Sequence, residues 1–413
     1  NPAFAADNAW YLFPIKNAEA YNAGQLTHFS DVGISAPDDR TIVITLERPT
    51  PYLPALVSLP AWFPLNPRSL EKFGAMEQRG KPWTRPGNLV SNGAYQLAEW
   101  TPDVRIVLDK NPHHRDAAAA RLEHIVFLPF AKPDDEERNY RAGQLHVTFN
   151  LPVTKLAPWR ERAPTQLRVD SLLQSNFLRF NTTRAPFTDA RVRRALSLAL
   201  DRKLLARTVL QGSRLPANTI TPPHTGTYQA PTGMPTDFDT ARRLLAEAGY
   251  AKGVGLPALE LMCRNDEIMP RLAEAIQAIW QKELGVHITI SQVEQKTWIQ
   301  NQQNLDYSVC MSAWTADFPD PVTFLELFVG EGSYNWTGWS RPGYDQLLTA
   351  ASTETNDTTR YALLQKAEAM LLLAAPVAPL YYGAQTYLLH PAVQGWTPSP
   401  LGFRRFQLIA LEP

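Results

Sequence analysis

The strand–helix–strand succession at residues 258–293 restricts the fold more than any other feature of the chain. An apolar run at 258–263 precedes an amphipathic stretch at 269–284, which ends at Gly285, and a second apolar run follows at 286–293. Glycine commonly follows the last helical residue because it adopts a left-handed conformation there. Strands joined by a helix are usually parallel and connected by a right-handed crossover. These residues therefore predict an α/β fold with a parallel sheet.

The next strand, within residues 307–324 (YSVCMSAWTADFPDPVTF), ends in side chains suited to recognition. Residues 309–313 are a mostly apolar run without helical period, which predicts a buried strand. Trp314, Asp317 and Phe318 follow it, and a carboxylate between two aromatic rings suits a cationic group. Ligands of open α/β sheets bind beyond the carboxyl ends of the strands. We therefore predict that Asp317 contacts a ligand.

A purely structural alternative explains only part of this stretch. Asp followed by Pro is typical of a helix start, with Asp as the N-cap and Pro as the first helical residue. Asp320 and Pro321 fit that pattern. It leaves Asp317 unexplained.

Composition excludes several classes of protein. A chain of 413 residues exceeds one compact core and suggests two or three domains. Forty basic and forty acidic residues give a formal net charge of zero, which argues against nucleic-acid binding. The longest apolar run, residues 369–375, is too short to span a membrane. The eight histidines are scattered, and the motifs of zinc proteases, nucleotide-binding loops and serine hydrolases do not occur. We expect no metal, cofactor or nucleic-acid partner.

The two cysteines do not form a disulfide framework. Cys263 and Cys310 each lie in a predicted buried strand, where free cysteine acts as a small hydrophobic residue. If the two strands are neighbours the sulfur atoms could meet. The sequence does not fix the geometry that a disulfide requires, so both possibilities stay open.

The rest of the chain alternates between β-rich and α/β character. The β-rich part contains a predicted hairpin at 95–109, strands at 122–130 and 145–152, and a helix at 134–143. The α/β part contains further predicted elements: a strand from 167, one helix from Asp189 to Gly212, a helix ending at Gly249, helices at 344–352 and 357–374, and a strand at 375–383. The tail from Gln385 is extended again. A chain that leaves one domain and returns to it would form a hinge at the crossings.

Several segments together resemble the peptide/nickel family of periplasmic oligopeptide-binding proteins of ABC importers. They are SNGAYQLAEW at 91–100, FNTTRAPFTDARVRRALSLALDR at 180–202, TARRLLAEAGY at 240–250, AWTADFPDP at 313–321 and VAPLYYG at 377–383. They occur in the family's order and cover nearly the whole chain. The resemblance adds support for a discontinuous domain organisation.

The resemblance implies an α/β, two-lobed fold of the periplasmic-binding-protein type, with a hinge and an extra domain that is partial here. Residues 1–76 would be the end of the extra domain. Residues 77–173 and 385–413 would form a discontinuous first lobe, and residues 174–384 the second lobe, with the parallel strand–helix–strand unit. The family normally has a further N-terminal segment, which is absent from this sequence. If nothing replaces that segment, strand edges and part of the ligand cleft would be open.

The resemblance also implies a function: capture of peptides or peptide-like amines between the lobes and delivery to a membrane permease. The protein would be exported to the periplasm or cell surface, without a signal peptide in this chain, and we expect a monomer. Asp317 would hold the α-ammonium group of the peptide, and the backbone of residues 313–315 (Ala313, Trp314, Thr315) would pair with the extended peptide. Trp314 would also form a pocket wall. The other expected site residues are Phe318, Met311, Phe177 and Asn181.

The chain departs from the family where the peptide carboxylate is received. Well-known members have arginines at the positions of Met311 and Gln302 and a histidine after the strand that ends at Cys263. A bridging cysteine pair of the family falls at Gln174 and Thr315, and both cysteines are missing here. We therefore expect a ligand with a free amine and without a short-peptide carboxylate requirement, such as a longer or modified peptide.

Two other functions remain as alternatives. The aromatic residues Tyr334, Trp336 and Trp339 could form a sugar platform of a carbohydrate-active enzyme, or they could be a loop packed on the core. Glycoside hydrolysis needs two carboxylates at a defined separation, and the sequence offers one convincing candidate. A scaffold or holdase role would follow from an incomplete cleft. We favour the binding protein.

Overall fold

The computed structural model describes residues 1–413 except 5, 7, 77 and 413, and it divides into two compact units. Unit 1 contains Asn1–Val147, Leu389–Thr397 and Phe403–Pro413, and unit 2 contains Thr148–Leu388 and Pro398–Gly402. Both units are therefore discontinuous in sequence. The finer division into an extra domain and a first lobe stays a prediction.

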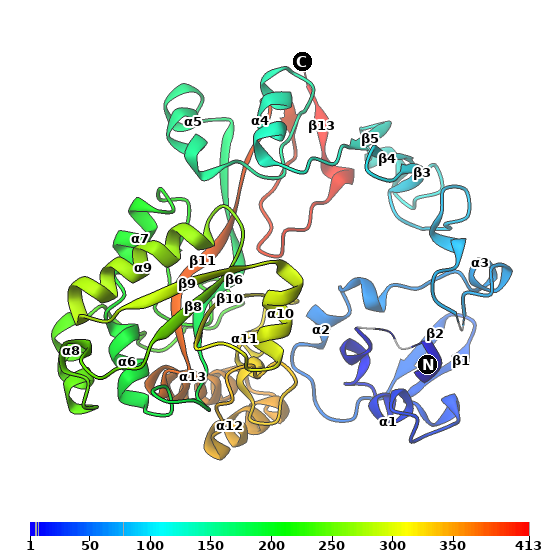
Figure 1. Cartoon of the computed structure of the whole chain (residues 1–413). Helices are drawn as coiled ribbons and strands as arrows, with labels where there is room; N and C mark the ends of the chain where they lie inside the picture. Colours follow the sequence, from blue (N-terminus) through cyan, green and yellow to red (C-terminus); the bar gives the residue numbers. More distant parts are fainter. Residues whose placement is uncertain (5, 7, 77, 413) are drawn as a thin grey trace. The chain divides into compact units, whose positions relative to one another are not determined.

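Unit 1 consists of small antiparallel sheets and short helices (Figure 1). Its strands are β1 (Ile34–Asp38), β2 (Thr41–Ile44), β3 (Tyr95–Thr101), β4 (Arg105–Lys110), β5 (His124–Phe127), β12 (Val393–Gln394) and β13 (Ala410–Leu411). Its α-helices are α1 (Ala18–Asn22), α2 (Leu53–Leu56), α3 (Pro67–Lys72) and α4 (Pro133–Arg141). The predicted hairpin at 95–109 is present as β3 and β4.

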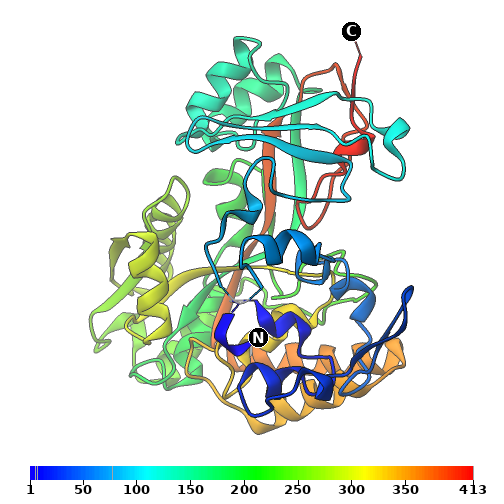
Figure 2. The same ribbon diagram turned by 90° about the vertical axis from the view of Figure 1, so that its right-hand side faces the viewer.

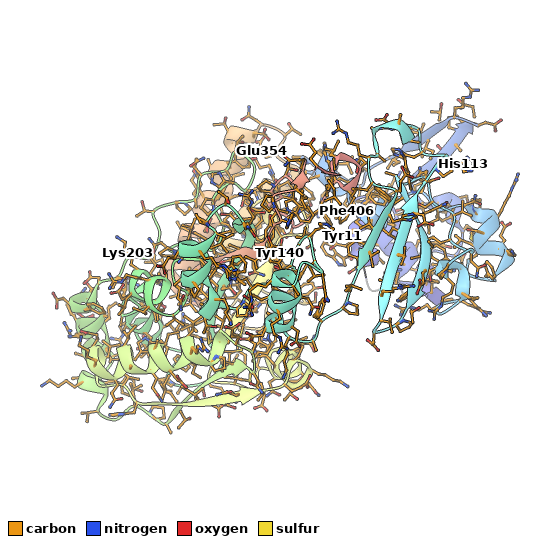
Figure 3. The ribbon with its side chains drawn as sticks, turned by 90° about the horizontal axis from the view of Figure 1, so that it is seen from above. Tyr11, His113, Tyr140, Lys203, Glu354 and Phe406 are labelled. Atoms are coloured by element: carbon orange, nitrogen blue, oxygen red, sulfur yellow. The ribbon has the colours of Figure 1, made fainter. Side chains whose placement is uncertain are left out.

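The strand predicted at 145–152 is wrong. In this stretch Val147 alone makes a bridge, to Leu389. Phe149 is 72% exposed, so its apolar side chain does not enter the core. Within unit 1, Phe127 packs edge-on against Phe406, and their ring centroids lie 5.6 Å apart. Phe406 is labelled in Figure 3.

Unit 2 is built on one six-stranded sheet with the order β7-β11-β6-β10-β8-β9. The strands are β6 (Leu167–Phe180), β7 (Leu215–Pro216), β8 (Leu259–Arg264), β9 (Ile288–Val293), β10 (Val309–Thr315) and β11 (Val377–Leu388). β8 is parallel to β9 and β10, whereas β6 is antiparallel to β10 and β11. Figure 2 shows the long strands β6 and β11 side by side.

The sheet is therefore mixed, and the prediction of a parallel sheet holds only for β10, β8 and β9. The helix between β8 and β9 is α9 (Met269–Leu284), and Gly285 ends it with φ +69°. A Cβ atom at Gly285 would also lie 2.3 Å from the Lys252 carbonyl oxygen, so only glycine fits there. The pattern at 258–293 could not show the antiparallel strands, because β6 and β11 enter the sheet from distant parts of the chain.

Helices cover both faces of this sheet with separate apolar clusters. One cluster joins the sheet to α6 (Ala190–Leu198), α7 (Arg202–Thr208), α8 (Phe238–Glu247) and α9. The other joins it to α11 (Val322–Leu325), α12 (Pro342–Thr353) and α13 (Asp357–Ala374). Phe177 belongs to the second cluster and its neighbour Leu178 to the first, because successive strand residues point to opposite faces. The remaining α-helices of unit 2 are α5 (Leu156–Arg162) and α10 (Gln295–Gln303).

The single helix predicted from Asp189 to Gly212 is two helices, α6 and α7. Asp189 caps α6 by accepting from the Arg191 N–H, as predicted. Asp201 then caps α7 by accepting from the Leu204 N–H, and a second cap interrupts a helix because its residue takes a non-helical conformation. The buried Arg202 side chain donates to carbonyl oxygens at the end of α6, which replaces the hydrogen bonds that a continuous helix would make.

Candidate functional site

The candidate site is built around β10, whose two edges differ. Against β6, β10 is paired from Val309 to Thr315. Against β8, it is paired only at Val309 and Cys310. Among the described residues, no strand continues the pairing on the β8 side beyond Cys310. The second half of β10 therefore has an open edge.

Ala313 and Thr315 direct their backbone groups toward this open edge. The carbonyl of Ser308 and the N–H of Ala316 bond to the β6 side. Alternate residues of an antiparallel strand bond to opposite sides, so the odd-numbered residues of β10 face away from β6. Consistently, the Met311 carbonyl accepts from the indole of Trp298, at 3.0 Å. An extended ligand could pair with Ala313 and Thr315 in the way that β8 pairs with Val309.

An aromatic surface lies beside this edge. The rings of Trp314 and Tyr334 meet edge-on at 5.2 Å, and the Tyr334 ring contacts that of Trp336 at 5.9 Å. The Trp314 indole donates to the Thr323 hydroxyl at 3.4 Å. Thr315 is exposed, and Ala313, Trp314 and Asp317 are half-buried. These four predicted site residues therefore share the surface at the end of β10.

The four other predicted site residues lie in the interior below it. Met311, Phe177, Phe318 and Asn181 are buried. Phe177 packs against Phe328, with ring centroids 6.1 Å apart. The Asn181 amide donates to the carbonyl oxygens of Leu305 (2.8 Å) and Tyr307 (3.1 Å). These contacts fix the turn that leads into β10, so Asn181 lies near the start of the strand, at the opposite end from Thr315.

Asp320 anchors the segment that carries Asp317. Its carboxylate accepts from the Val322 N–H at 3.0 Å, at the start of α11, as the Asp-Pro pattern predicts. It also forms a bidentate ion pair with Arg360 of α13, with N–O distances of 2.8 and 2.7 Å. Both residues are buried, and a bidentate pair of this kind restricts its two partners strongly. The backbone three residues after Asp317 is therefore held in place.

The positions of the family's cysteine pair face each other across β6 and β10. Gln174 and Thr315 are register partners, and the Gln174 amide donates to the Thr315 hydroxyl at 2.8 Å. A polar contact thus occupies the place of a covalent one.

Cys263 and Cys310 are free and buried. Their strands are neighbours, but the register pairs Cys310 with Met262. Burial raises the pKa of Cys263 to about 11 and raises the pKa of Cys310 as well. Thiols that stay protonated are poor nucleophiles. Both cysteines therefore act as apolar side chains of the core.

Arg179, which we did not predict from the sequence, is a cation next to this site. Arg179 lies on β6 opposite Cys310 and is 1% exposed. Its Nε donates to the Ser312 hydroxyl at 3.0 Å and its Nη1 to the Tyr334 carbonyl at 3.3 Å. The guanidinium stacks over Trp336 at 5.1 Å from the ring centroid. Burial lowers the pKa of Arg179. A lone arginine in the apolar run NFLRFN was the available signal.

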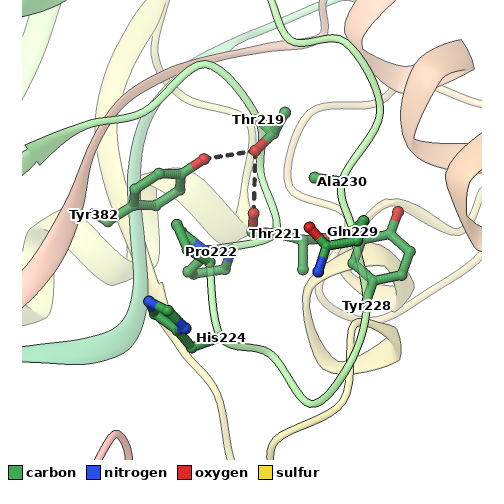
Figure 4. A pocket seen from close by; sticks show the side chains of 9 residues that line it. Thr219, Thr221, Pro222, His224, Tyr228, Gln229, Ala230 and Tyr382 are labelled. Atoms are coloured by element: carbon green, nitrogen blue, oxygen red, sulfur yellow. Dashed lines mark hydrogen bonds between the residues drawn. The ribbon is translucent and has the colours of Figure 1, made fainter.

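A pocket of about 270 Å³ opens beside β11 (Figure 4). Its lining includes Tyr382 and residues of the loop 219–230, among them Thr219, His224 and Tyr228. The hydroxyl groups of Thr219 and Tyr382 share a hydrogen bond of 2.5 Å. Tyr382 and Trp314 are both register partners of Ser175. Residues paired across strands share a face of the sheet, so the pocket and Trp314 lie on the same face.

The described residues contain no cluster of three or more side chains suited to hold a metal ion. His113, labelled in Figure 3, donates its backbone N–H to the Asn111 side chain in a turn. In the part of the chain that the structure describes, no helix is both long and apolar enough to cross a bilayer.

A mixed α/β sheet with an open strand edge, beside a carboxylate and aromatic rings, is typical of a protein that binds an extended solute. The chain belongs to the bacterial extracellular solute-binding proteins, family 5 Middle, whose profile matches residues 3–336. Its two-lobed relatives confirm the predicted fold class. Membership of a solute-binding family decides against the alternative of a carbohydrate-active enzyme.

Three relatives illustrate the similarity. The periplasmic oligopeptide-binding protein OppA of Salmonella typhimurium is 33% identical over 377 residues, which cover 89% of this chain and 68% of that protein. The probable deoxycholate-binding periplasmic protein YgiS of Escherichia coli is 33% identical over 96% of this chain and 74% of its own length. The solved structure of the murein tripeptide binding protein MppA of Escherichia coli matches with a TM-score of 0.83 and 31% identity, over 100% of this chain and 81% of that one.

Proposed function

We propose that this protein captures peptides with a free amino terminus and delivers them to the membrane permease of an ABC importer. The observation that carries this proposal is the open edge of β10 with Asp317 just beyond its end. Main-chain pairing of a peptide with a free strand edge supplies affinity that is independent of the peptide's side chains. The names of the oligopeptide and murein tripeptide relatives support the same ligand class.

In this proposal the residues have distinct roles. The Asp317 carboxylate pairs with the peptide's α-ammonium group, and Ala313 and Thr315 exchange backbone hydrogen bonds with the first residues of the peptide. Trp314 and Tyr334 offer aromatic surface to the adjoining side chains. The pocket at Thr219 and Tyr382 offers hydroxyl groups and space for a polar side chain, with water filling the remainder.

The protein acts outside the cytoplasmic membrane, in the periplasm or at the cell surface, and works as a monomer. The description of its family as extracellular supports this location. Its partner is the permease, which recognises one conformation of the protein. The ligand shifts the protein toward that conformation only if the ligand binds it more tightly than the alternative conformation.

The role of Asp317 is tested by calorimetry with a set of six-residue peptides, each with a free or an acetylated amino terminus. We expect the free-amine peptides to bind the wild-type protein about 30-fold more tightly, which corresponds to about 2 kcal/mol. Asp317→Asn should abolish this preference, because a neutral amide forms no ion pair, and should leave the affinity for acetylated peptides unchanged.

Asp239→Asn is the matched control, because Asp239 has the same charge and its side chain on α8 is 98% exposed. It should keep the wild-type preference. Equal binding of free and acetylated peptides by the wild-type protein would contradict the role of Asp317. Failure of every peptide to bind would contradict peptide capture itself.

A further inference from the structure

Arg179 is a buried guanidinium that, among the residues the structure describes, has no hydrogen bond to a carboxylate. Its two hydrogen bonds go to the hydroxyl of Ser312 and the carbonyl of Tyr334, and the second is long at 3.3 Å. The titratable groups that act on it electrostatically are Tyr307 and Cys310. Burial raises the pKa of both, so neither carries a negative charge near pH 7. A guanidinium carries five N–H donors, and burying an ionised group without a counter-charge is energetically unfavourable.

The other buried arginines of unit 2 are better satisfied. Arg360 forms its bidentate ion pair with Asp320. Arg193 donates to carbonyl oxygens of four residues, including Ala374 at 2.6 Å and Phe187 at 2.5 Å. Arg202 donates to three carbonyl oxygens, including that of Pro379 at 2.7 Å. Arg179 therefore stands out as the buried arginine that retains the most capacity for an anion.

Arg179 is linked to β10 by its hydrogen bond to Ser312, a residue of that strand. The Ser312 hydroxyl that accepts from Arg179 donates in turn to the Gln302 side chain at 2.8 Å. Ser312 lies five positions before Asp317 in the sequence. Because β10 ends at Thr315 and Asp317 lies in the bend that follows, at most roughly 17 Å of extended chain separates the two residues. A peptide held at Asp317 by its amine, and lying along β10, would reach the level of Ser312 with about its fifth residue.

A short segment without helix or strand, residues 333–336, covers the guanidinium. We call it the cover segment. Tyr334 accepts from Arg179 through its carbonyl and contacts Trp314 through its ring, and the Trp336 ring lies over the guanidinium. Tyr334 is 39% exposed. The Tyr334 carbonyl is thus a hydrogen-bond acceptor of the buried cation next to the aromatic surface of the site.

We propose that Arg179 receives a carboxylate of the bound peptide, about five residues from the peptide's amino terminus, in place of the Tyr334 carbonyl. The carboxylate is the carboxyl terminus of a short peptide or an acidic side chain of a longer one. Arginine suits this role because its planar fork binds a carboxylate through two parallel hydrogen bonds. The inference rests on the proposed function. It replaces the expectation of a ligand without a carboxylate requirement, because Arg179 supplies a cation that the positions of Met311 and Gln302 lack.

The first test varies the ligand and uses the wild-type protein. Five-residue peptides with a free carboxyl terminus are compared with the same peptides as carboxyl amides. Eight-residue amides with Glu at position 5 are compared with the same peptides carrying Gln. We expect at least a tenfold tighter binding of the acid in one of the two pairs, and the pair that shows it identifies the source of the carboxylate. Equal binding of acid and amide in both pairs overturns the inference and leaves peptide capture intact.

The second test varies the protein. Arg179→Met should bind the acid and amide peptides with about equal affinity. Its affinity for the amide peptides should differ from that of the wild type by less than about twofold. Arg179→Lys, which keeps the charge without the fork, should retain part of the preference. Arg243→Gln is the matched control, because Arg243 lies on the exposed side of α8 and pairs with Glu247; it should behave as the wild type. An acid preference that persists in Arg179→Met contradicts the inference.

Discussion

A single buried carboxyl group, Glu368, holds the pocket loop to α13. One oxygen accepts from the N–H groups of Ile220 (2.9 Å) and Thr221 (2.8 Å), and the other accepts from the Tyr228 hydroxyl at 2.8 Å. Burial raises the pKa of Glu368 above its ordinary value of 4.5, although these hydrogen bonds oppose the shift. The folded protein therefore favours the protonated acid more than the unfolded chain does.

This shift predicts a pH-dependent stability. A raised pKa in the folded state contributes stability that is complete below the ordinary pKa and is lost as the pH rises through the folded-state pKa. Glu368→Gln replaces the acid with a neutral group of the same shape. The free energy of unfolding of the wild type minus that of the variant should fall from pH 4 to pH 8, as measured by urea unfolding. Glu260→Gln, at an exposed position of β8, should show no such trend. A difference that is constant with pH would contradict the assignment.

At the scale of the element, the antiparallel register of β6 and β10 determines which side chains meet at the site. It places Gln174 opposite Thr315 and Arg179 opposite Cys310. Gln174 and Thr315 occupy a pair whose backbone groups point away from each other, and such pairs bring the Cα atoms closest. That spacing lies within the range of a disulfide.

The register predicts that Gln174→Cys with Thr315→Cys forms a disulfide. The bond would join residues 141 positions apart, and closing such a long loop stabilises by up to about 4–5 kcal/mol in the chain-entropy model. After oxidation in air, mass spectrometry under non-reducing conditions should show the loss of two hydrogen atoms, and thermal unfolding should occur at a higher temperature without reductant than with it. Gln174→Cys alone should stay reduced, because Cys263 and Cys310 are buried in their own strands. A double variant that remains reduced would contradict the register.

Elements with strong local signals could be predicted from the sequence. The helices α8 and α9 have clear periodicity, and the caps Asp189 and Asp237 are visible as residues before an apolar period. The break between α6 and α7 was missed because a cap at Asp201 outweighs the continuing helical pattern. The mixed sheet and the position of Arg179 were missed for another reason: strand neighbours are set by tertiary contacts, and no local pattern reports which residue of β6 faces which residue of β10.

At the scale of the whole molecule, the chain passes between the two units four times, at residues 147–148, 388–389, 397–398 and 402–403. The residues of the proposed site on β10 and the following segment all belong to unit 2. A ligand that binds the folded protein and not the unfolded chain raises stability by mass action, by about 2.7 kcal/mol at a concentration of 100 times Kd. Peptides retained through purification would therefore stabilise the protein that is isolated.

The central claim, peptide capture, is tested most directly by native mass spectrometry of the purified protein, followed by fragmentation of whatever it releases on gentle unfolding. The account predicts a heterogeneous set of peptides with free amino termini and with a carboxylate about five residues along. The Asp317→Asn protein should carry fewer of them. A single non-peptide mass, such as a steroid acid of the kind named for the YgiS relative, would contradict the account and would keep only the fold.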